Sequence, residues 1–331
     1  MILSIAETAW HHEGDVDFML NLIDDICYKT SADYIKLHIT LDFDEYMSLD
    51  HQNYHMQKPW LIHADDWEKI ILKIRSYKKK ILLLLNDTKA IEFASKFKPE
   101  GVELHSVCLN VPRLQESLMK NIDSDAKIFI GVGGSSMEEI DQAINFFSNR
   151  EIVLMFGFQN YPTYIENINL RKIRKIQSFY NNCNYGFADH TSFDDKNNEL
   201  ISLIGASNNM QYIEKHVTNQ IGVDRCDYSA AISIEMFNSL LNNLRLVDQM
   251  NGSGFLEFNQ GEDNYSEIGY MKMTLCALKN LEEGEIVNLD NFDFIRTSQE
   301  NGLKQIDLRK VIGKPINKFL KKGQILLNAD I

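Results

Sequence analysis

The chain has 331 residues, 44% of them hydrophobic and 24% charged, so it is long enough to bury one large core and a second small one. Its formal net charge of −13 argues against a general binder of nucleic acid or of an anionic membrane, because both partners require a basic surface field. The N-terminus has no basic leader and no apolar run approaches the ~20 residues of a membrane span, so we expect a cytoplasmic protein.

Short apolar runs recur along the first two thirds of the chain, with helical patterns between them. They are Leu3–Ala6, Tyr34–Leu37, Ile81–Leu85, Val102–Leu104, Ile128–Val132, Ile152–Phe156, Tyr185–Phe187 and Tyr212–Glu214. The residues that follow Asp15, Ser135, Asn169 and Ile234 keep the i, i+3, i+4 spacing of one buried helix face. This alternation predicts an α/β fold, a closed (β/α)₈ TIM barrel.

The chain changes character after residue 250. Residues 251–268 are rich in glycine, asparagine and acidic residues and lack a helical period, which indicates a linker over 251–269. Beyond it, LKNLEEGEIVNLDNF and INKFLKKGQILLNADI share an apolar strand, a charged glycine turn and a second strand. We therefore predict a barrel over 1–250 and a small, mostly β, internally repeated domain over 270–331.

The reacting groups of such a barrel lie at the carboxyl ends of its strands and in the loops that follow. His190 and His216 end adjacent predicted strands, where two neutral imidazoles can share one divalent cation. The alternative for either histidine alone is a hydrogen bond to a loop carbonyl. Pairing on neighbouring strand ends favours the metal site.

Lys36 interrupts an alternating strand, and a lysine inside a barrel needs an anion to offset its desolvation. A phosphate or carboxylate ligand fits this need as well as pairing with Glu7 or Glu214 does. Glu13, in the loop after the first strand, is a candidate general acid or base, and the alternative is a solvated carboxylate that caps the next helix.

Several phrases of the chain, taken together, resemble the sialic acid synthase (N-acetylneuraminate synthase) family. They are IAETAWHHEGDVDFMLNLID, SADYIKLH, GVGGSSMEEI, QNYPTYIENINLRKI, YGFADHT and YIEKHVT, which occur in the family's order. The C-terminal residues are similar to the antifreeze-like (SAF, β-clip) domain that ends these enzymes. The resemblance covers most of the chain, and YGFADHT and YIEKHVT are its most specific parts.

The resemblance implies condensation of phosphoenolpyruvate with an N-acetylated amino sugar, or a related deoxy sugar, to a nonulosonic α-keto acid and phosphate. It implies a divalent metal, manganese before magnesium or cobalt, on His190 and His216. It further implies that Glu13 is the acid/base, that Lys36 contacts phosphoenolpyruvate and that Asp227 contacts the sugar. Arg296 would contact the substrate from the C-terminal domain of the partner chain, and the resemblance therefore implies a homodimer. By position, Gln159 and Asp189 are additional substrate-binding candidates.

The chain departs from the family at its fourth predicted strand. The family's K-I-G-S-G-E phrase, which holds phosphoenolpyruvate, is replaced by VELHSV, with Val102, His105 and Val107 nearest the three anion-handling residues. The loop after the third strand and the residue at Ala188 also differ. These departures keep two alternatives open: another carbonyl addition or aldol-type reaction in which His105 takes part, and a sugar-binding homologue without catalysis.

Overall fold

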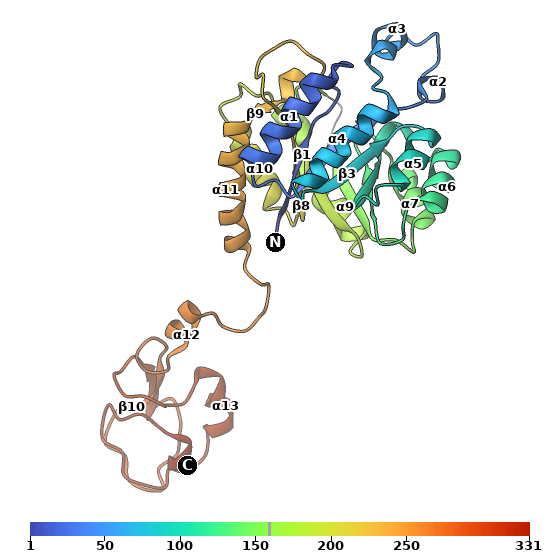
Figure 1. Cartoon of the computed structure of the whole chain (residues 1–331). Helices are drawn as coiled ribbons and strands as arrows, with labels where there is room; N and C mark the ends of the chain where they lie inside the picture. The colour runs from blue at the N-terminus through green and yellow to red at the C-terminus, as the bar shows by residue number, and fades with distance from the viewer. Residues whose placement is uncertain (158–159) are drawn as a thin grey trace. The chain divides into compact units, whose positions relative to one another are not determined.

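The structure is a computed structural model that describes residues 1–157 and 160–331 (Figure 1). The chain divides into two compact units, Met1–Gly252 and Ser253–Ile331, each of which is described by itself below. No helix among the described residues has the length and apolar character needed to cross a membrane.

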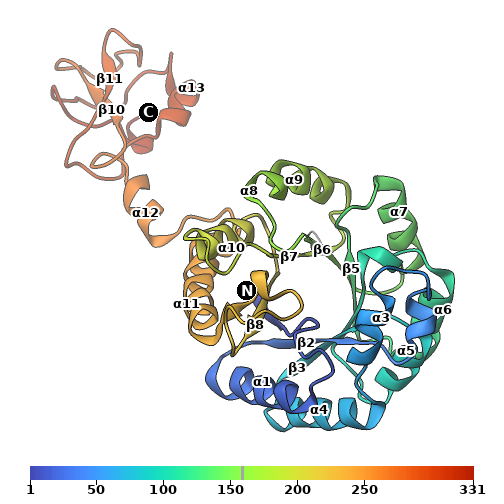
Figure 2. The ribbon, with the colours of Figure 1, turned by 90° about the horizontal axis from the view of Figure 1, so that it is seen from above.

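The first unit is a closed barrel of eight parallel strands, seen from above in Figure 2. Its strands are β1 (Leu3–Glu7), β2 (Tyr34–Ile39), β3 (Lys80–Leu85), β4 (Gly101–Leu104), β5 (Lys127–Gly131), β6 (Ile152–Phe156), β7 (Asn184–Ala188) and β8 (Tyr212–Thr218). Each strand pairs with the next, and β1 pairs with β8, which closes the barrel. A two-residue strand, β9 (Ile232–Ser233), pairs in parallel with the end of β8. The predicted (β/α)₈ barrel is confirmed.

Helices follow the strands and cover the outside of the barrel (Figures 1 and 2). They are α1 (Val16–Lys29), α4 (Ala64–Ser76), α5 (Thr88–Ser95), α6 (Pro112–Asn121), α7 (Met137–Phe146), α8 (Ile165–Ile168), α9 (Leu170–Phe179), α10 (Asn198–Ala206) and α11 (Ile234–Asn251). The short helices α2 (Phe43–Tyr46) and α3 (Tyr54–Gln57) lie between β2 and α4.

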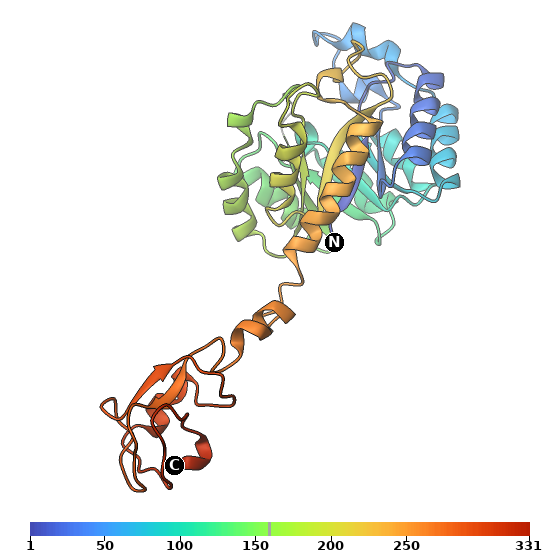
Figure 3. The same cartoon turned by 90° about the vertical axis from the view of Figure 1, so that its left-hand side faces the viewer.

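Local capping explains where the main helices begin. Asp15 accepts a hydrogen bond from the Phe18 N–H and starts α1, while Ser136 and Glu139 form a capping box on α7. The capping role considered for Glu13 is therefore wrong, because Asp15 fills that position. Figure 3 shows α11, the longest helix, packed along one side of the barrel.

Two apolar layers support the barrel. The larger lies between the strands and the helices, and a smaller cluster fills the inside of the barrel. The inner cluster consists of Ile5, Tyr34, Leu82, Phe129, Val153, Met155, Ala188 and Tyr212. This inner cluster is called the apolar floor below. Because every second side chain of a strand points inward, the residue two positions after a floor residue lies one layer above the floor.

The second unit contains one regular antiparallel pair, β10 (Thr274–Ala277) with β11 (Phe292–Ile295), and a single-turn helix α13 (Leu308–Val311). Isolated bridges supply its other strand-like contacts, so regular β structure is sparser than the predicted mostly β domain. The short helix α12 (Gln260–Ser266) lies within the residues predicted as a linker, where the sequence shows no helical period; an Asn259–Glu262 capping box starts it.

The internal repeat predicted for the C-terminal residues is visible in this unit. Leu281 and Leu320, which are equivalent in the two phrases, form an antiparallel bridge with hydrogen bonds in both directions. The two turn glycines, Gly284 and Gly323, both have a positive φ, 91° and 82°. The match to an antifreeze-like domain stays a prediction.

Candidate active site

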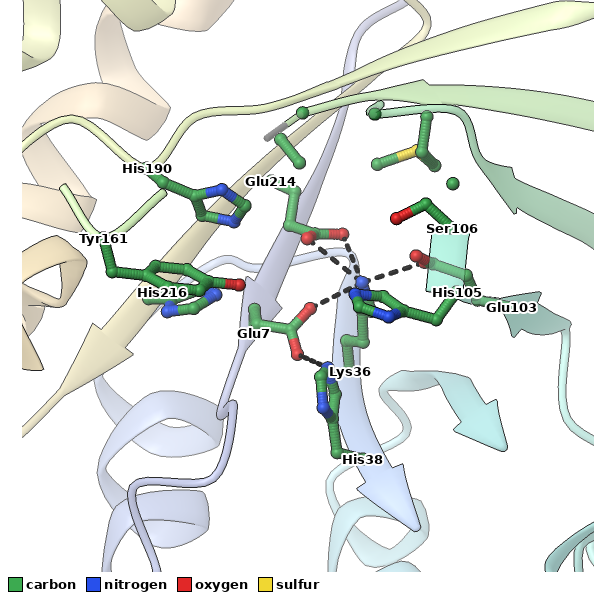
Figure 4. A pocket seen from close by; sticks show the side chains of 15 residues that line it. Glu7, Lys36, His38, Glu103, His105, Ser106, Tyr161, His190, Glu214 and His216 are labelled. Carbon is green, nitrogen blue, oxygen red and sulfur yellow. Dashed lines mark hydrogen bonds and ion pairs between the residues drawn. The ribbon is translucent and has the colours of Figure 1, made fainter. Parts of the chain in front are cut away.

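A polar pocket lies within the barrel above the apolar floor, lined by residues from most of the strand ends (Figure 4). Its lining residues are Glu7, Lys36, His38, Glu103, His105, Ser106, Gly131, Gly133, Met155, Gly157, Tyr161, Ala188, His190, Glu214 and His216. The predicted residues Lys36, His105, His190 and His216 therefore share one pocket.

Lys36 is enclosed by three carboxylates, and the four side chains are here called the Lys36 cluster. The Lys36 Nζ lies 2.7 Å from Glu7 Oε2, 2.8 Å from Glu103 Oε2 and 3.0 Å from Glu214 Oε2. All four side chains are at most 4% exposed. Of the two possibilities that the sequence leaves open for Lys36, the structure shows the pairing with Glu7 and Glu214. A contact between Lys36 and phosphoenolpyruvate stays a prediction.

Burial and like charges set the protonation of the Lys36 cluster. Burial raises the pKa of Glu103 to about 8, although Lys36 opposes the shift; Glu214 and Glu7 raise the pKa further. Burial also raises the pKa of Glu214 to about 8. For Lys36, burial lowers the pKa, but the three carboxylates outweigh burial and hold it well above the usual value.

Two histidines, His38 and His105, lie beside this cluster in the pocket lining. His38 Nε2 lies 2.7 Å from Glu7 Oε1, and the His38 ring is 6.2 Å from the His105 ring. Burial lowers the pKa of both imidazoles well below the usual histidine value. Both rings are therefore neutral at neutral pH and can accept or donate hydrogen bonds.

The predicted metal ligands, here called the histidine pair, lie together. The rings of His190 and His216 are 4.7 Å apart, and Tyr161 contacts both rings, 4.9 Å and 5.4 Å from them (Figure 4). Burial lowers the pKa of His216 well below the usual range, so its ring is a neutral base.

The histidine pair fits a divalent cation in its chemistry. His216 Nδ1 is buried and has no hydrogen-bond partner among residues 1–157 and 160–331, which is expected of a ring that binds something else. Within residues 1–157 and 160–331, no three His, Cys, Asp or Glu side chains are grouped to hold a metal ion. A cation bound there would therefore rely on two imidazoles and on oxygen atoms from water or substrate.

Asp189 is directed away from the pocket, toward α10. Its carboxylate lies 3.1 Å from Lys215 Nζ and accepts hydrogen bonds from Ser202 and Thr191. Its pKa is lowered, because Lys215 and these hydrogen bonds outweigh the effect of burial. The predicted substrate contact is not supported by this position; instead Asp189 joins the carboxyl ends of β7 and β8, beside the histidine pair.

Asp227 lines a second pocket that shares His38, His105 and Tyr161 with the first. Burial raises the pKa of Asp227 to about 6, and Trp10 is part of the same lining. This position is compatible with the predicted sugar contact.

Glu13 lies outside both linings. It is half-buried, and its Oε1 accepts a hydrogen bond from the Cys226 N–H. In the structure Glu13 therefore holds the loop that carries Asp227, while its acid/base role stays a prediction.

Two predicted residues are not brought to this pocket within the described barrel. Arg296 lies in the second unit, is exposed, and donates a hydrogen bond from Nε to the Tyr270 carbonyl. Gln159 falls outside the described residues. The roles expected for both remain predictions.

Sequence reasoning missed Glu103 and Tyr161 as members of the site. The rule that strand ends carry the chemistry does select His38, which shares the inward face of β2 with Lys36 two residues earlier. Glu103 also gave a signal, since it is a charged residue in a short, otherwise apolar strand. Tyr161 lies in a loop, where the periodicity of the sequence does not indicate which way a side chain points.

Proteins that are similar to this chain include the following two relatives and one solved structure. An uncharacterized protein of Methanocaldococcus jannaschii (MJ1065) is 25% identical, over 99% of this chain and 94% of that protein. A pseudaminic acid synthase of Campylobacter jejuni is 24% identical, over 72% of this chain and 67% of that enzyme. A putative spore coat polysaccharide biosynthesis protein E of Chromobacterium violaceum has the same fold, with a TM-score of 0.82, 18% identity and coverage of 100% and 99%.

A family model extends the comparison across most of the barrel. The model of the NeuB family matches residues 28–255, which include β2 to β8, the histidine pair and Lys36. This agrees with the resemblance to sialic acid synthases that the sequence phrases indicate. The chain belongs to the NeuB family.

Proposed function

We propose that this protein condenses phosphoenolpyruvate with the open-chain form of an N-acetylated amino sugar, or a related deoxy sugar, giving a nonulosonic α-keto acid and phosphate. The observation that carries the proposal is the histidine pair in one pocket with Lys36, at the carboxyl ends of the strands of a NeuB-family barrel.

His190 and His216 would hold a divalent cation, with manganese as the first candidate and magnesium or cobalt as alternatives. Polarisation of the sugar's aldehyde oxygen is the chemistry that such a cation supplies. The described residues then have separate tasks. Lys36 is the single lysine or arginine in the described pocket lining, and so it is the group that attracts the anionic co-substrate.

We assign the sugar to the second pocket, the one that contains Asp227, which is called the outer pocket below. Asp227 would accept hydrogen bonds from sugar hydroxyls, while Trp10 and Tyr161 offer aromatic faces in the same lining. Arg296 would reach this pocket from the second unit of a partner chain, which makes a homodimer the active form. Glu13 fixes the loop that carries Asp227, through the Cys226 N–H, and is the candidate acid/base at this end.

One observation favours a second candidate function. The three carboxylates around Lys36 already satisfy its ammonium, and Val102 and Val107 stand where the family has anion-handling groups. A barrel with this lining could perform a different carbonyl addition, or an aldol-type cleavage, without phosphoenolpyruvate. His105 would then contact the reacting carbonyl.

The deciding experiment supplies the protein with Mn²⁺, phosphoenolpyruvate and a panel of N-acetylated and deoxy amino sugars, and measures released phosphate. We expect metal-dependent phosphate release with at least one sugar, together with a keto acid that has three more carbons than that sugar. Absence of phosphate release across the panel contradicts the condensation. Metal-dependent consumption of a keto sugar without phosphoenolpyruvate would support the second candidate.

A further inference from the structure

The charges of the Lys36 cluster do not balance. Three carboxylates, Glu7, Glu103 and Glu214, approach one ammonium group within 3.1 Å, and water reaches none of them appreciably. The described lining of the pocket contains no second lysine or arginine. Buried carboxylates packed this closely cannot all be ionised, because their mutual repulsion adds to the cost of desolvation. The cluster must hold at least one proton at neutral pH.

The contacts show which carboxylate holds that proton most readily. Glu214 receives hydrogen bonds from Lys36 on both of its oxygens, at 3.1 Å and 3.0 Å. Glu7 uses one oxygen for Lys36 and the other for His38. Glu103 has a single ion-pair contact, from Oε2 to Lys36 at 2.8 Å, and this contact does not have hydrogen-bond geometry. Glu103 is therefore the member of the cluster with the fewest contacts that stabilise the anion.

The surroundings of Glu103 agree with this assignment. The ionisable groups that face it are Lys36 and His38 from β2, Glu7 from β1, Glu214 from β8, and His105 and Cys108 after β4. Burial raises the pKa of Glu103 to about 8, against the pull of Lys36. His38 and His105 are neutral, so they add no positive charge that would ionise Glu103.

A neutral carboxylic acid in such a place can donate a hydrogen bond to an anion without adding negative charge. Such a donor would supplement Lys36 in this pocket, since the side chains of Val102 and Val107 provide none. Resting on the condensation proposed above, we propose that Glu103 acts as a neutral acid that donates its hydrogen to an anionic oxygen of phosphoenolpyruvate, and that it thereby determines the affinity for this substrate.

The proposal predicts a proton linkage. A hydrogen bond from the protonated carboxyl group must be present in the complex, so above the pKa of free Glu103, about 8, binding takes up one proton. The dissociation constant of phosphoenolpyruvate should then rise about tenfold for each pH unit above that value. The amide of Glu103→Gln is an isosteric donor that does not titrate in this range, so its affinity should not change with pH.

The experiment is calorimetric titration of phosphoenolpyruvate into the full-length protein with Mn²⁺ at pH 7 and pH 9. Buffers of different ionisation enthalpy report the protons taken up. We expect nearly one proton at pH 9 for the wild type and none for Glu103→Gln, whose affinity at pH 9 is about tenfold tighter than that of the wild type. The control Glu151→Gln removes a carboxylate outside the pocket that contacts Lys127, and should behave as the wild type.

The outcomes separate this inference from the proposed function. Phosphoenolpyruvate that binds the wild type at pH 9 without proton uptake contradicts the role of Glu103 and leaves the condensation standing. Binding that is lost in Glu103→Gln at both pH values, while Glu151→Gln binds normally, also contradicts the role, since an amide donor should replace the acid. Failure of every form to bind phosphoenolpyruvate overturns both proposals.

Discussion

The histidine pair and the Lys36 cluster share one pocket, but burial acts on them in opposite directions. In the histidine pair, burial lowers the pKa of His216, so the ring keeps a free lone pair. In the Lys36 cluster, burial raises the pKa of Glu103 and Glu214 to about 8, so carboxyl groups keep protons. Burial in the same barrel therefore keeps His216 of the histidine pair as a neutral base and keeps carboxyl groups of the Lys36 cluster as neutral hydrogen-bond donors.

The largest effect is expected on the histidine side. His190→Ala removes one imidazole from the pair, and loss of Lewis-acid stabilisation worth several kcal/mol should slow phosphate release by about a thousandfold or more. Rates and bound manganese should fall together. His63→Ala is the control, because His63 is exposed at the start of α4 and lies outside both pockets. A rate loss that equals that of the control would mean that the pair does not act in catalysis.

The Lys36 side should respond most strongly in stability. Lys36→Met leaves three buried carboxylates without their cation, so the free energy of unfolding should fall by about 3 to 5 kcal/mol near pH 8. The loss should be smaller at pH 6, where the carboxylates can take up protons. Urea unfolding at the two pH values measures this difference. Adding Glu103→Gln to Lys36→Met should restore part of the loss, and an unchanged loss in the double variant would contradict the account of the cluster.

The two sides should also divide the pH dependence of stability between them. Burial lowers the pKa of His216 in the histidine pair, and also of His11 (to about 4) and His12 (to about 3) in the loop after β1, so stability rises with pH up to the unfolded value of about 6.5. Raised carboxyl pKa values make stability fall as pH rises from the unfolded value of about 4.3 to the folded value of about 8. The histidines are more numerous, so the metal-free protein should be most stable between pH 6.5 and 7.

Above pH 7 the histidines no longer contribute to the pH dependence of stability, whereas the carboxyl groups of the Lys36 cluster still do. Stability should fall there by about 1.4 kcal/mol per pH unit for each proton that the native state retains. Glu103→Gln should make this alkaline limb shallower, and it should also steepen the rise between pH 5 and pH 6.5, because the raised pKa of Glu103 opposes that rise. Urea unfolding between pH 5 and pH 8.5 tests the division, and a flat alkaline limb in the wild type would rule out a proton stored in the Lys36 cluster.

The smallest effect is expected at the sugar end. Asp227→Asn keeps the shape of the outer pocket but weakens a hydrogen bond to the sugar, so the KM for the sugar should rise about tenfold. The KM for phosphoenolpyruvate should stay unchanged. Steady-state kinetics with each substrate varied in turn measures both values. A change in the KM for phosphoenolpyruvate alone would contradict the assignment of Asp227 to the sugar.

The barrel was predictable because its strands are continuous apolar runs and its helices have one apolar face. The strand β6 has the predicted bounds, Ile152–Phe156, and β1 extends beyond the predicted run only by Glu7. The helix α12 was missed because it is short and exposed, and a capping box rather than an apolar face marks its start. Apolar periodicity therefore locates the buried elements well and the solvated ones poorly.

The candidate site was predictable only in part. His190 and His216 came from the rule that strand ends carry the chemistry, and the structure places them together. Asp189 was misjudged because the two consecutive residues after β7 point in different directions: Asp189 contacts Ser202 of α10, while His190 lines the pocket. The partners of Lys36 come from three different strands, and only closure of the barrel brings them together.

The most direct test of the account is a crystal structure of the protein with Mn²⁺ and phosphoenolpyruvate, with anomalous scattering recorded at the manganese edge. The account predicts one anomalous peak bound to the rings of His190 and His216, with an anionic oxygen of phosphoenolpyruvate in hydrogen-bond contact with Lys36 and Glu103. A manganese ion bound elsewhere with the histidine pair empty, or phosphoenolpyruvate outside this pocket, would contradict it.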